Sequence, residues 1–136
     1  MFEVIHEFAV LGTASFMMAL ATVWYSPMLF GKIWMKETGL TEEKIQAAEV
    51  HMIKHMILTF VSYTIMLGLL AYFLAYVPLL SVTAIQAVGM ISLFVAASAV
   101  GPTLFEGRSL QYYAIRVGFY VLFIMLGTFI LEFWPW

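Results

Sequence analysis

The chain has 136 residues, of which 64% are hydrophobic and 10% are charged, and its formal net charge is −2. Soluble domains are about half apolar and about a quarter charged, so this composition indicates an integral membrane protein. The net charge excludes a basic surface for nucleic acid. The chain contains no cysteine, which excludes disulfides, thiolate nucleophiles and cysteine metal sites.

The first predicted membrane span covers residues 8–25 and is closed by Ser26-Pro27. Proline ends a helix well because it lacks an N–H donor and clashes with the preceding turn. Residues 1–7 are acidic, whereas a cleaved signal peptide begins with positive charge. We therefore expect this run to be a retained helix.

The segment that follows, residues 26–54, is predicted to be helical in two pieces. Ser26 can cap a first piece that has Pro27 at its first helical position and runs to Lys36. Apolar side chains alternate there with lysines at helical spacing, which is typical of a short interfacial helix. Gly39 is the predicted C-terminal stop.

The second piece begins at Thr41, a good N-cap, followed by Glu42 and Glu43 at the positive end of the helix dipole. Nothing between Thr41 and Val77 forces a break. The sequence therefore predicts one long helix, of which the first part is a cytoplasmic extension of the second span.

The remaining spans are predicted over residues 56–77, 81–101 and 110–133, with Pro78 and Pro102 as the ends of the second and third. No Asp, Glu, Lys or Arg occurs between His55 and Phe105, and one span needs about 20 such residues. The predicted fold is a single all-α membrane domain, residues 1–136, with four transmembrane helices arranged as two hairpins.

The positive charges predict the orientation. All six Lys and Arg residues fall in the segments after the first and third spans or just inside the fourth. The positive-inside rule makes loops 26–55 and 102–109 cytoplasmic and puts both termini outside. The predicted location is a cell membrane, crossed several times.

The run from Trp24 to Trp34, WYSPMLFGKIW, resembles a motif of domain-of-unknown-function 1761, a family of small four-helix membrane proteins. Gly101-Pro102, the FEGR run at 105–108, Gly118 and Gly127 are also similar to the family, so the resemblance covers most of the chain. It implies the four-span fold and a bacterial inner membrane. It implies no activity, cofactor or catalytic residue.

The candidate site lies in the fourth span. Arg108, Tyr112, Arg116 and Tyr120 recur every four residues and form one stripe along the helix. An arginine inside a membrane span is a functional candidate by default. Together with side chains expected at similar depth, it defines a cytoplasm-facing polar layer for a small anion or lipid headgroup: Arg116, Arg108, Tyr112, Tyr120, Glu106, Tyr25, Ser62, Tyr63 and Ser98.

We expect Arg116 to point into the bundle, with Tyr112 or Tyr120 beside it. The alternative is that Arg116 only extends to the lipid phosphates, as long cationic side chains near helix ends do.

Two functions remain open, and neither requires a cofactor. The sequence favours a small-solute or ion permeation unit acting as a homo-oligomer among membrane lipids. The alternative is a non-transporting accessory, lipid-binding or scaffold protein. An enzyme is disfavoured because no Ser–His–acid set can be assembled on one side of the membrane. His51 and His55 have metal-ligand spacing, but no third ligand is evident, so no metal site is predicted.

Overall fold

The computed structural model describes residues 7–80 and 82–134. These residues form helices α1 (Glu7–Trp24), α2 (Gly31–Thr38), α3 (Glu42–Ala48), α4 (Met52–Tyr76), α5 (Ala84–Ser98), α6 (Val100–Phe105) and α7 (Leu110–Phe133), with 3₁₀ turns η1 (Glu49–His51) and η2 (Val77–Leu80). Within these two ranges there is no strand. The all-α prediction is confirmed for this part of the chain.

Four helical segments are long and apolar enough to cross a membrane. They are Glu7–Trp24, Glu42–Tyr76, Ala84–Phe105 and Leu110–Phe133. The first and last agree with the predicted spans to within one residue at each end. Their length and composition are compatible with a multi-pass membrane protein.

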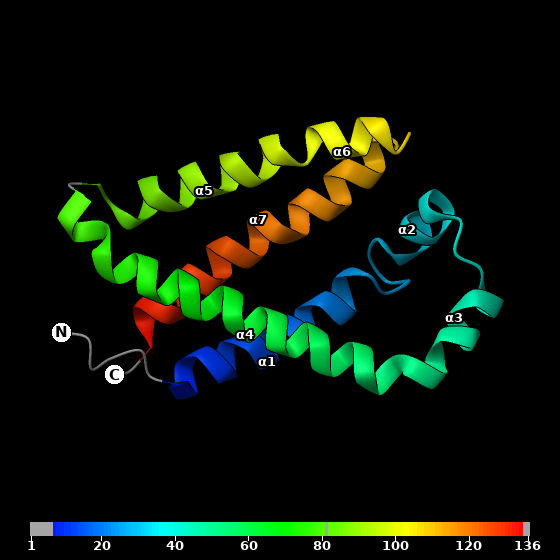
Figure 1. The fold of residues 1–136 in the computed structure, drawn as a ribbon, viewed down its shortest axis with the longest axis horizontal. Coiled ribbons are helices and arrows are strands. Elements are labelled where there is room, and N and C mark those ends of the chain that lie inside the picture. The colour runs from blue at the N-terminus through cyan, green and yellow to red at the C-terminus, as the bar shows by residue number, and fades with distance from the viewer. Residues whose placement is uncertain (1–6, 81, 135–136) are drawn as a thin grey trace.

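Helix α7 lies at the centre of the fold. It packs against α1, α2, α4 and α5, and Figure 1 shows it running between the α1–α4 pair and α5. Phe119 and Phe123 of α7 are 2% and 1% exposed, and Met17 of α1 and Leu67 of α4 are fully buried against them. Side chains therefore fill the space between α1, α4 and α7.

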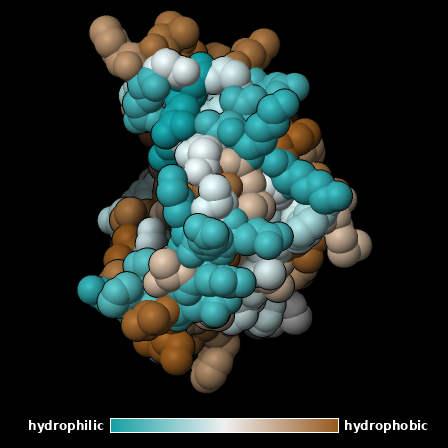
Figure 2. Space-filling model, turned by 90° about the vertical axis from the view of Figure 1, so that its right-hand side faces the viewer, coloured by the Kyte–Doolittle hydropathy of each residue, from teal (hydrophilic) through white to brown (hydrophobic). Residues whose placement is uncertain are grey.

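The two ends of the molecule differ in chemistry. The start of α1 lies beside the end of α7, since a Cβ on Gly12 would come within 3.3 Å of the Trp134 ring. The opposite end carries α2, α3 and the turn from α6 to α7 (Figure 1). Hydrophilic residues cover much of that end (Figure 2).

The predicted start of the helix at Pro27 is wrong, because α2 begins at Gly31. The Ser26 hydroxyl donates to the Val23 carbonyl at 2.6 Å, at the end of α1, and does not cap a new helix. A tight turn follows, in which the Gly31 N–H donates to the Ser26 carbonyl at 2.9 Å. A Cβ on Gly31 would lie 2.6 Å from the Ser26 carbonyl carbon, so the turn requires glycine there.

The prediction that Pro102 ends the third span is also wrong. Helix α5 ends at Ser98, and α6 then runs from Val100 through Pro102 to Phe105. Pro102 lies in the first turn of α6, where a backbone N–H has no partner within the helix and proline is tolerated. The helical segment stops before Gly107, which has a φ of +67°.

Two predicted helix boundaries are confirmed. Gly39 ends α2 with a φ of 68°, and the Thr41 side chain caps α3 by accepting from the Lys44 N–H at 3.3 Å. The predicted long helix is present as one helical segment, Glu42–Tyr76. The 3₁₀ turn η1 interrupts its α-helical geometry, and the segment changes direction there (Figure 1). Helix α3 has no buried residue. Packing against other helices therefore fixes the direction of α4 but not that of α3.

Replacing Gly127 with leucine tests the close packing of α7 on α4. A Cβ at Gly127 would lie 2.9 Å from the Leu67 Cδ2 and 3.4 Å from the Leu70 Cδ2. Because overpacking forces neighbours out of their rotamers, we expect Gly127→Leu to lower the stability by roughly 1–3 kcal/mol. Gly68→Leu is the control, since a Cβ at Gly68 meets nothing within 4 Å. Thermal unfolding in detergent measures both, and equal stabilities would contradict this packing.

Candidate functional site

Helix α2 is held against the start of α7 by polar contacts to Glu37. The Arg108 Nη1 donates to the Glu37 backbone carbonyl at 3.0 Å, and the Ser109 hydroxyl donates to the Glu37 carboxylate. Ser109 also caps α7, because its oxygen accepts from the Tyr112 N–H at 3.1 Å. We call the three residues Glu37, Arg108 and Ser109 the α2 latch.

Aromatic rings continue this contact toward the long apolar helices. Trp34 of α2 stacks on Tyr112 of α7, with ring centroids 5.0 Å apart and planes 14° apart. Tyr25 meets the edge of Trp34, with centroids 4.9 Å apart. The Trp24 indole N–H donates to the Ile115 carbonyl at 3.1 Å, which ties the end of α1 to α7.

Five of the nine residues predicted for the polar layer gather around Phe119. The rings of Tyr25, Tyr63 and Tyr120 lie 5.8, 6.3 and 5.8 Å from the Phe119 ring. Arg116 and Tyr112 adjoin them on α7, and Tyr25 interacts electrostatically with all four of the others. We call Tyr25, Tyr63, Tyr112, Arg116 and Tyr120 the tyrosine–arginine cluster.

The Arg116 Nη1 donates to the Tyr112 hydroxyl at 2.9 Å, so the predicted contact with Tyr112 is confirmed. Arg116 shares a face of α7 with the buried residues Tyr112, Phe119 and Phe123. Arg116 itself is exposed, whereas Tyr112 is only 6% exposed. The guanidinium is therefore accessible at the end of the packed face, and its predicted inward direction stays a prediction.

Tyr25 follows α1 and lies outside the four candidate membrane helices. Burial, with smaller effects of Tyr120 and Tyr63, raises the pKa of Tyr25 to about 12, although Arg116 acts in the opposite direction. Its hydroxyl is therefore neutral near pH 7 and available as a hydrogen-bond donor.

The other four predicted residues lie outside the cluster. Arg108 belongs to the latch, and its Nε lies 3.8 Å from the Glu106 carboxylate. The Arg108 guanidinium also lies 5.2 Å from the centre of the Tyr112 ring, which links the latch to the cluster. Ser62 is exposed on α4, and Ser98 donates its hydroxyl to the Val95 carbonyl of its own helix at 2.9 Å.

Glu37 was not among the predicted site residues, although its position carries a signal. An acidic side chain in the last turn of a helix opposes the helix dipole and requires a compensating partner. Ser109, immediately before the fourth span, has the residue type and position of an N-cap. Neither signal identifies the other residue as its partner, because the two are far apart in sequence.

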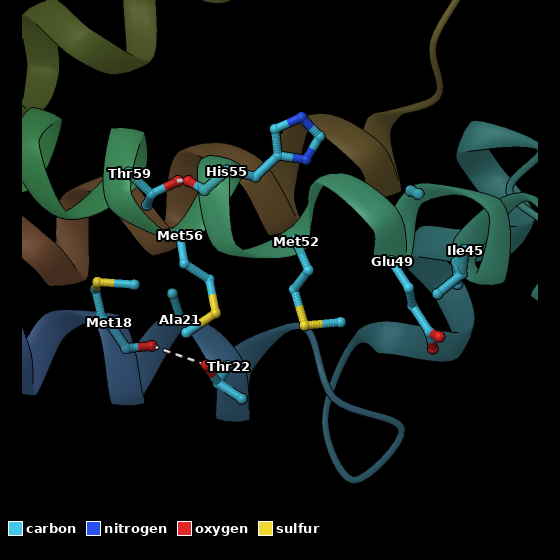
Figure 3. Close-up of a pocket in the computed structure, with 10 residues that line it drawn as sticks. Met18, Ala21, Thr22, Ile45, Glu49, Met52, His55, Met56 and Thr59 are labelled. Atoms are coloured by element: carbon cyan, nitrogen blue, oxygen red, sulfur yellow. Dashed lines mark hydrogen bonds between the residues drawn. The ribbon is translucent and has the colours of Figure 1, made fainter.

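A groove of about 380 Å³ lies between α1 and the α3–α4 segment on the same half of the molecule. In Figure 3 the side chains of Met52 and Met56 point from α4 toward α1, whereas the ring of His55 points away from Met56. The His51 and His55 rings are 6.2 Å apart. Among the residues that the structure describes, no group of three His, Asp or Glu side chains is placed to hold a metal ion.

These features define an all-helical protein with four helices compatible with membrane crossing and a tyrosine–arginine cluster near one end. The chain belongs to the family described as "Protein of unknown function (DUF1761)", whose family model matches residues 8–132. No curated protein and no solved structure matches the chain.

Removing the Glu37 side chain tests the α2 latch. Hydrogen bonds to a charged group contribute about 1 kcal/mol or more, so Glu37→Ala should free α2 and speed tryptic cleavage after Lys36 roughly five-fold. Glu43→Ala is the control, because Glu43 is also acidic but lies exposed on α3. Mass spectrometry of the early fragments measures the rates, and equal rates for the two variants would rule out the latch.

Proposed function

We propose that this protein binds an anionic phosphate-type group at Arg116, either the phosphate of a lipid headgroup or a small free anion. The main evidence for this function is that Arg116 is exposed and that its guanidinium donates a hydrogen bond to the Tyr112 hydroxyl. Within residues 7–80 and 82–134, no carboxylate lies within ion-pair distance of Arg116. A guanidinium has five N–H donors and stays charged at every accessible pH, so most of its donors remain for a ligand.

The depth of Arg116 supports this function. It lies six residues after the start of α7, which is about 9 Å along the helix axis. A charge at that depth costs free energy unless it meets water or an anion. Lipid phosphates lie at the membrane boundary, within reach of an arginine side chain. The neutral Tyr25 hydroxyl and the neighbouring Tyr120 would supply additional donors.

The same proposal includes an orientation in a cell membrane, the inner membrane of a bacterium. The four spans form two hairpins, with α2 at the interface and α3 in the cytoplasm. All six Lys and Arg residues belong to residues 32–54 and 108–116. Hydrophilic residues concentrate at the end of the molecule that carries these segments (Figure 2). The positive-inside rule supports a cytoplasmic location for this end.

The second candidate is a permeation unit for small solutes or ions that works as a homo-oligomer. Exposed apolar side chains on α5, among them Ile85, Leu93 and Phe94, supply a surface for a second copy. The filled space around Phe119 and Phe123 would place a path between copies rather than within one chain. For this reason we rank binding before permeation, the reverse of the order that the sequence favours. Anion uptake by proteoliposomes distinguishes the two, since binding alone produces no flux.

Exchanging Arg116 tests the binding function. We expect Arg116→Leu to weaken binding of a short-chain phosphatidylglycerol at least ten-fold, a loss of about 1.4 kcal/mol or more. Arg116→Lys should retain part of it, because lysine keeps the charge without the planar fork. Lys54→Leu, which removes an exposed cation from the same half, is the control.

Calorimetry in detergent with the lipid and with inorganic phosphate separates the two sources of the anion. Unchanged binding by a stable Arg116→Leu protein would mean that the arginine only extends to the membrane surface. The proposed function would then be wrong.

The orientation can be tested with reporters. We expect alkaline phosphatase fused after Trp136 to be active, because the C-terminus lies outside, and a green fluorescent protein fused there to stay dark. Fusions within the loop around Gly107 should behave in the opposite way. A fluorescent fusion at Trp136 would overturn the orientation.

A further inference from the structure

A second cavity lies between α5 and α7, away from the tyrosine–arginine cluster. Its volume is about 600 Å³, and it is lined by the first half of α5 and the second half of α7. Small residues on α5 leave it open: at Gly89, which lines it, a Cβ would meet nothing within 4 Å. The size is in the range of small-molecule sites.

Two buried hydroxyl groups line this cavity without a hydrogen-bond partner. The Ser92 Oγ and the Thr128 Oγ1 are both buried, and neither has a partner among the described residues. Thr128 is only 7% exposed. Other hydroxyls on the long helices donate back to their own backbone, as Thr13 does to the Ala9 carbonyl at 2.6 Å and Thr64 to the Phe60 carbonyl at 2.8 Å. Buried polar groups require partners, so the two free hydroxyls point to a ligand.

A carboxylate lines the same cavity. Glu132 lies four residues after Thr128, so α7 presents both side chains on one face. Phe129 and Phe133 also line the cavity, with ring centroids 4.8 Å apart. Every Lys and Arg of the chain belongs to residues 32–54 or 108–116, so none is contributed by the segments that form this cavity. Carboxylates and aromatic faces together attract cations.

We propose that the cavity between α5 and α7 binds a protonated lipophilic amine. Its apolar body fills the space between the helices. Its ammonium group pairs with the Glu132 carboxylate, and the Ser92 and Thr128 hydroxyls are the other polar groups that the cavity offers to the ligand. This site differs from the anion site at Arg116 in charge, in location and in the residues that form it, and it does not depend on the proposed function.

Three ligands with the same apolar body and different charges test the site. They are 3,3-diphenylpropylamine, the neutral 3,3-diphenylpropanol and the anionic 3,3-diphenylpropanoate, titrated into the full-length protein in nanodiscs at pH 7. We expect the amine to bind at least ten-fold more tightly than the alcohol, and the propanoate to bind more weakly than both. Equal affinities would mean that the cavity is only an apolar groove, filled by a lipid chain or covered by a second copy, and would overturn the proposal.

Variants assign the contacts. Glu132→Gln should lower the affinity for the amine at least ten-fold and leave the affinity for the alcohol unchanged. Ser92→Ala and Thr128→Val should each weaken binding of the amine several-fold. If one of these variants does not fold, the other still tests the role of the hydroxyl groups. Glu7→Gln is the matched control, because Glu7 is an acidic residue at the start of α1, near the end of α7, and does not line the cavity.

Arg116→Leu should bind the amine as the unaltered protein does, which keeps this test separate from that of the anion site. A Glu132→Gln protein with the affinity of the Glu7→Gln control would refute the role of Glu132. Failure of the amine to bind would refute the site as a whole.

Discussion

The rest of the structure depends on the burial of α7. Helix α7 is the most buried of the four long apolar helices, and it packs against α1, α2, α4 and α5. Its two most buried aromatic residues, Phe119 and Phe123, contact side chains from several of these helices. Glycine at position 127 permits the close approach of Leu67, and a larger residue there would push α4 away.

This central position also determines how the other helices are held. Helix α1 reaches α7 through the Trp24 indole, and α2 reaches it through Glu37 and Trp34. Helix α5 packs chiefly on α7 and diverges from α1 and α4 (Figure 1). Helices α5 and α7 also separate toward the start of α5 (Figure 1), and the cavity lined by Ser92 and Thr128 lies between them. Both candidate sites therefore arise from the packing around one helix.

The boundaries that could be predicted from sequence depend on local chemistry. Gly39 ends α2 because glycine adopts a positive φ at little cost, and Thr41 starts α3 because its oxygen accepts a free backbone N–H. The predictions at Pro27 and Pro102 failed because proline restricts the backbone without deciding whether a helix ends or begins. At Pro102 the outcome depends on the bend at Ala99. At Pro27 it depends on Ser26, whose hydroxyl is used by α1.

The sequence identified residues of the candidate site but only part of how they are arranged in space. Four-residue spacing on α7 is sufficient to bring Arg108, Tyr112 and Arg116 together. It does not determine which side of the helix is covered, and Arg116 proved to be exposed. The pairing of Glu37 with Ser109 joins two distant segments, so no local pattern could reveal it.

The hydroxyl groups of Ser92 and Thr128, which have no hydrogen-bond partner, also could not be recognised from local sequence. Any serine or threonine in a helix can donate to its own backbone, as Thr13 and Thr64 do. Nothing in the sequence distinguishes those residues from Ser92 and Thr128, which lack such a bond. The difference becomes visible only when α5 and α7 are placed side by side with a space between them.

The charge pattern then separates the two candidate sites. Arg116 lies in the first half of α7, and Glu132 lies in its last turn. Between them Phe119 and Phe123 are almost completely buried in packed side chains. The two sites share no residue, so an anion at one end of α7 and a cation at the other make no direct contact.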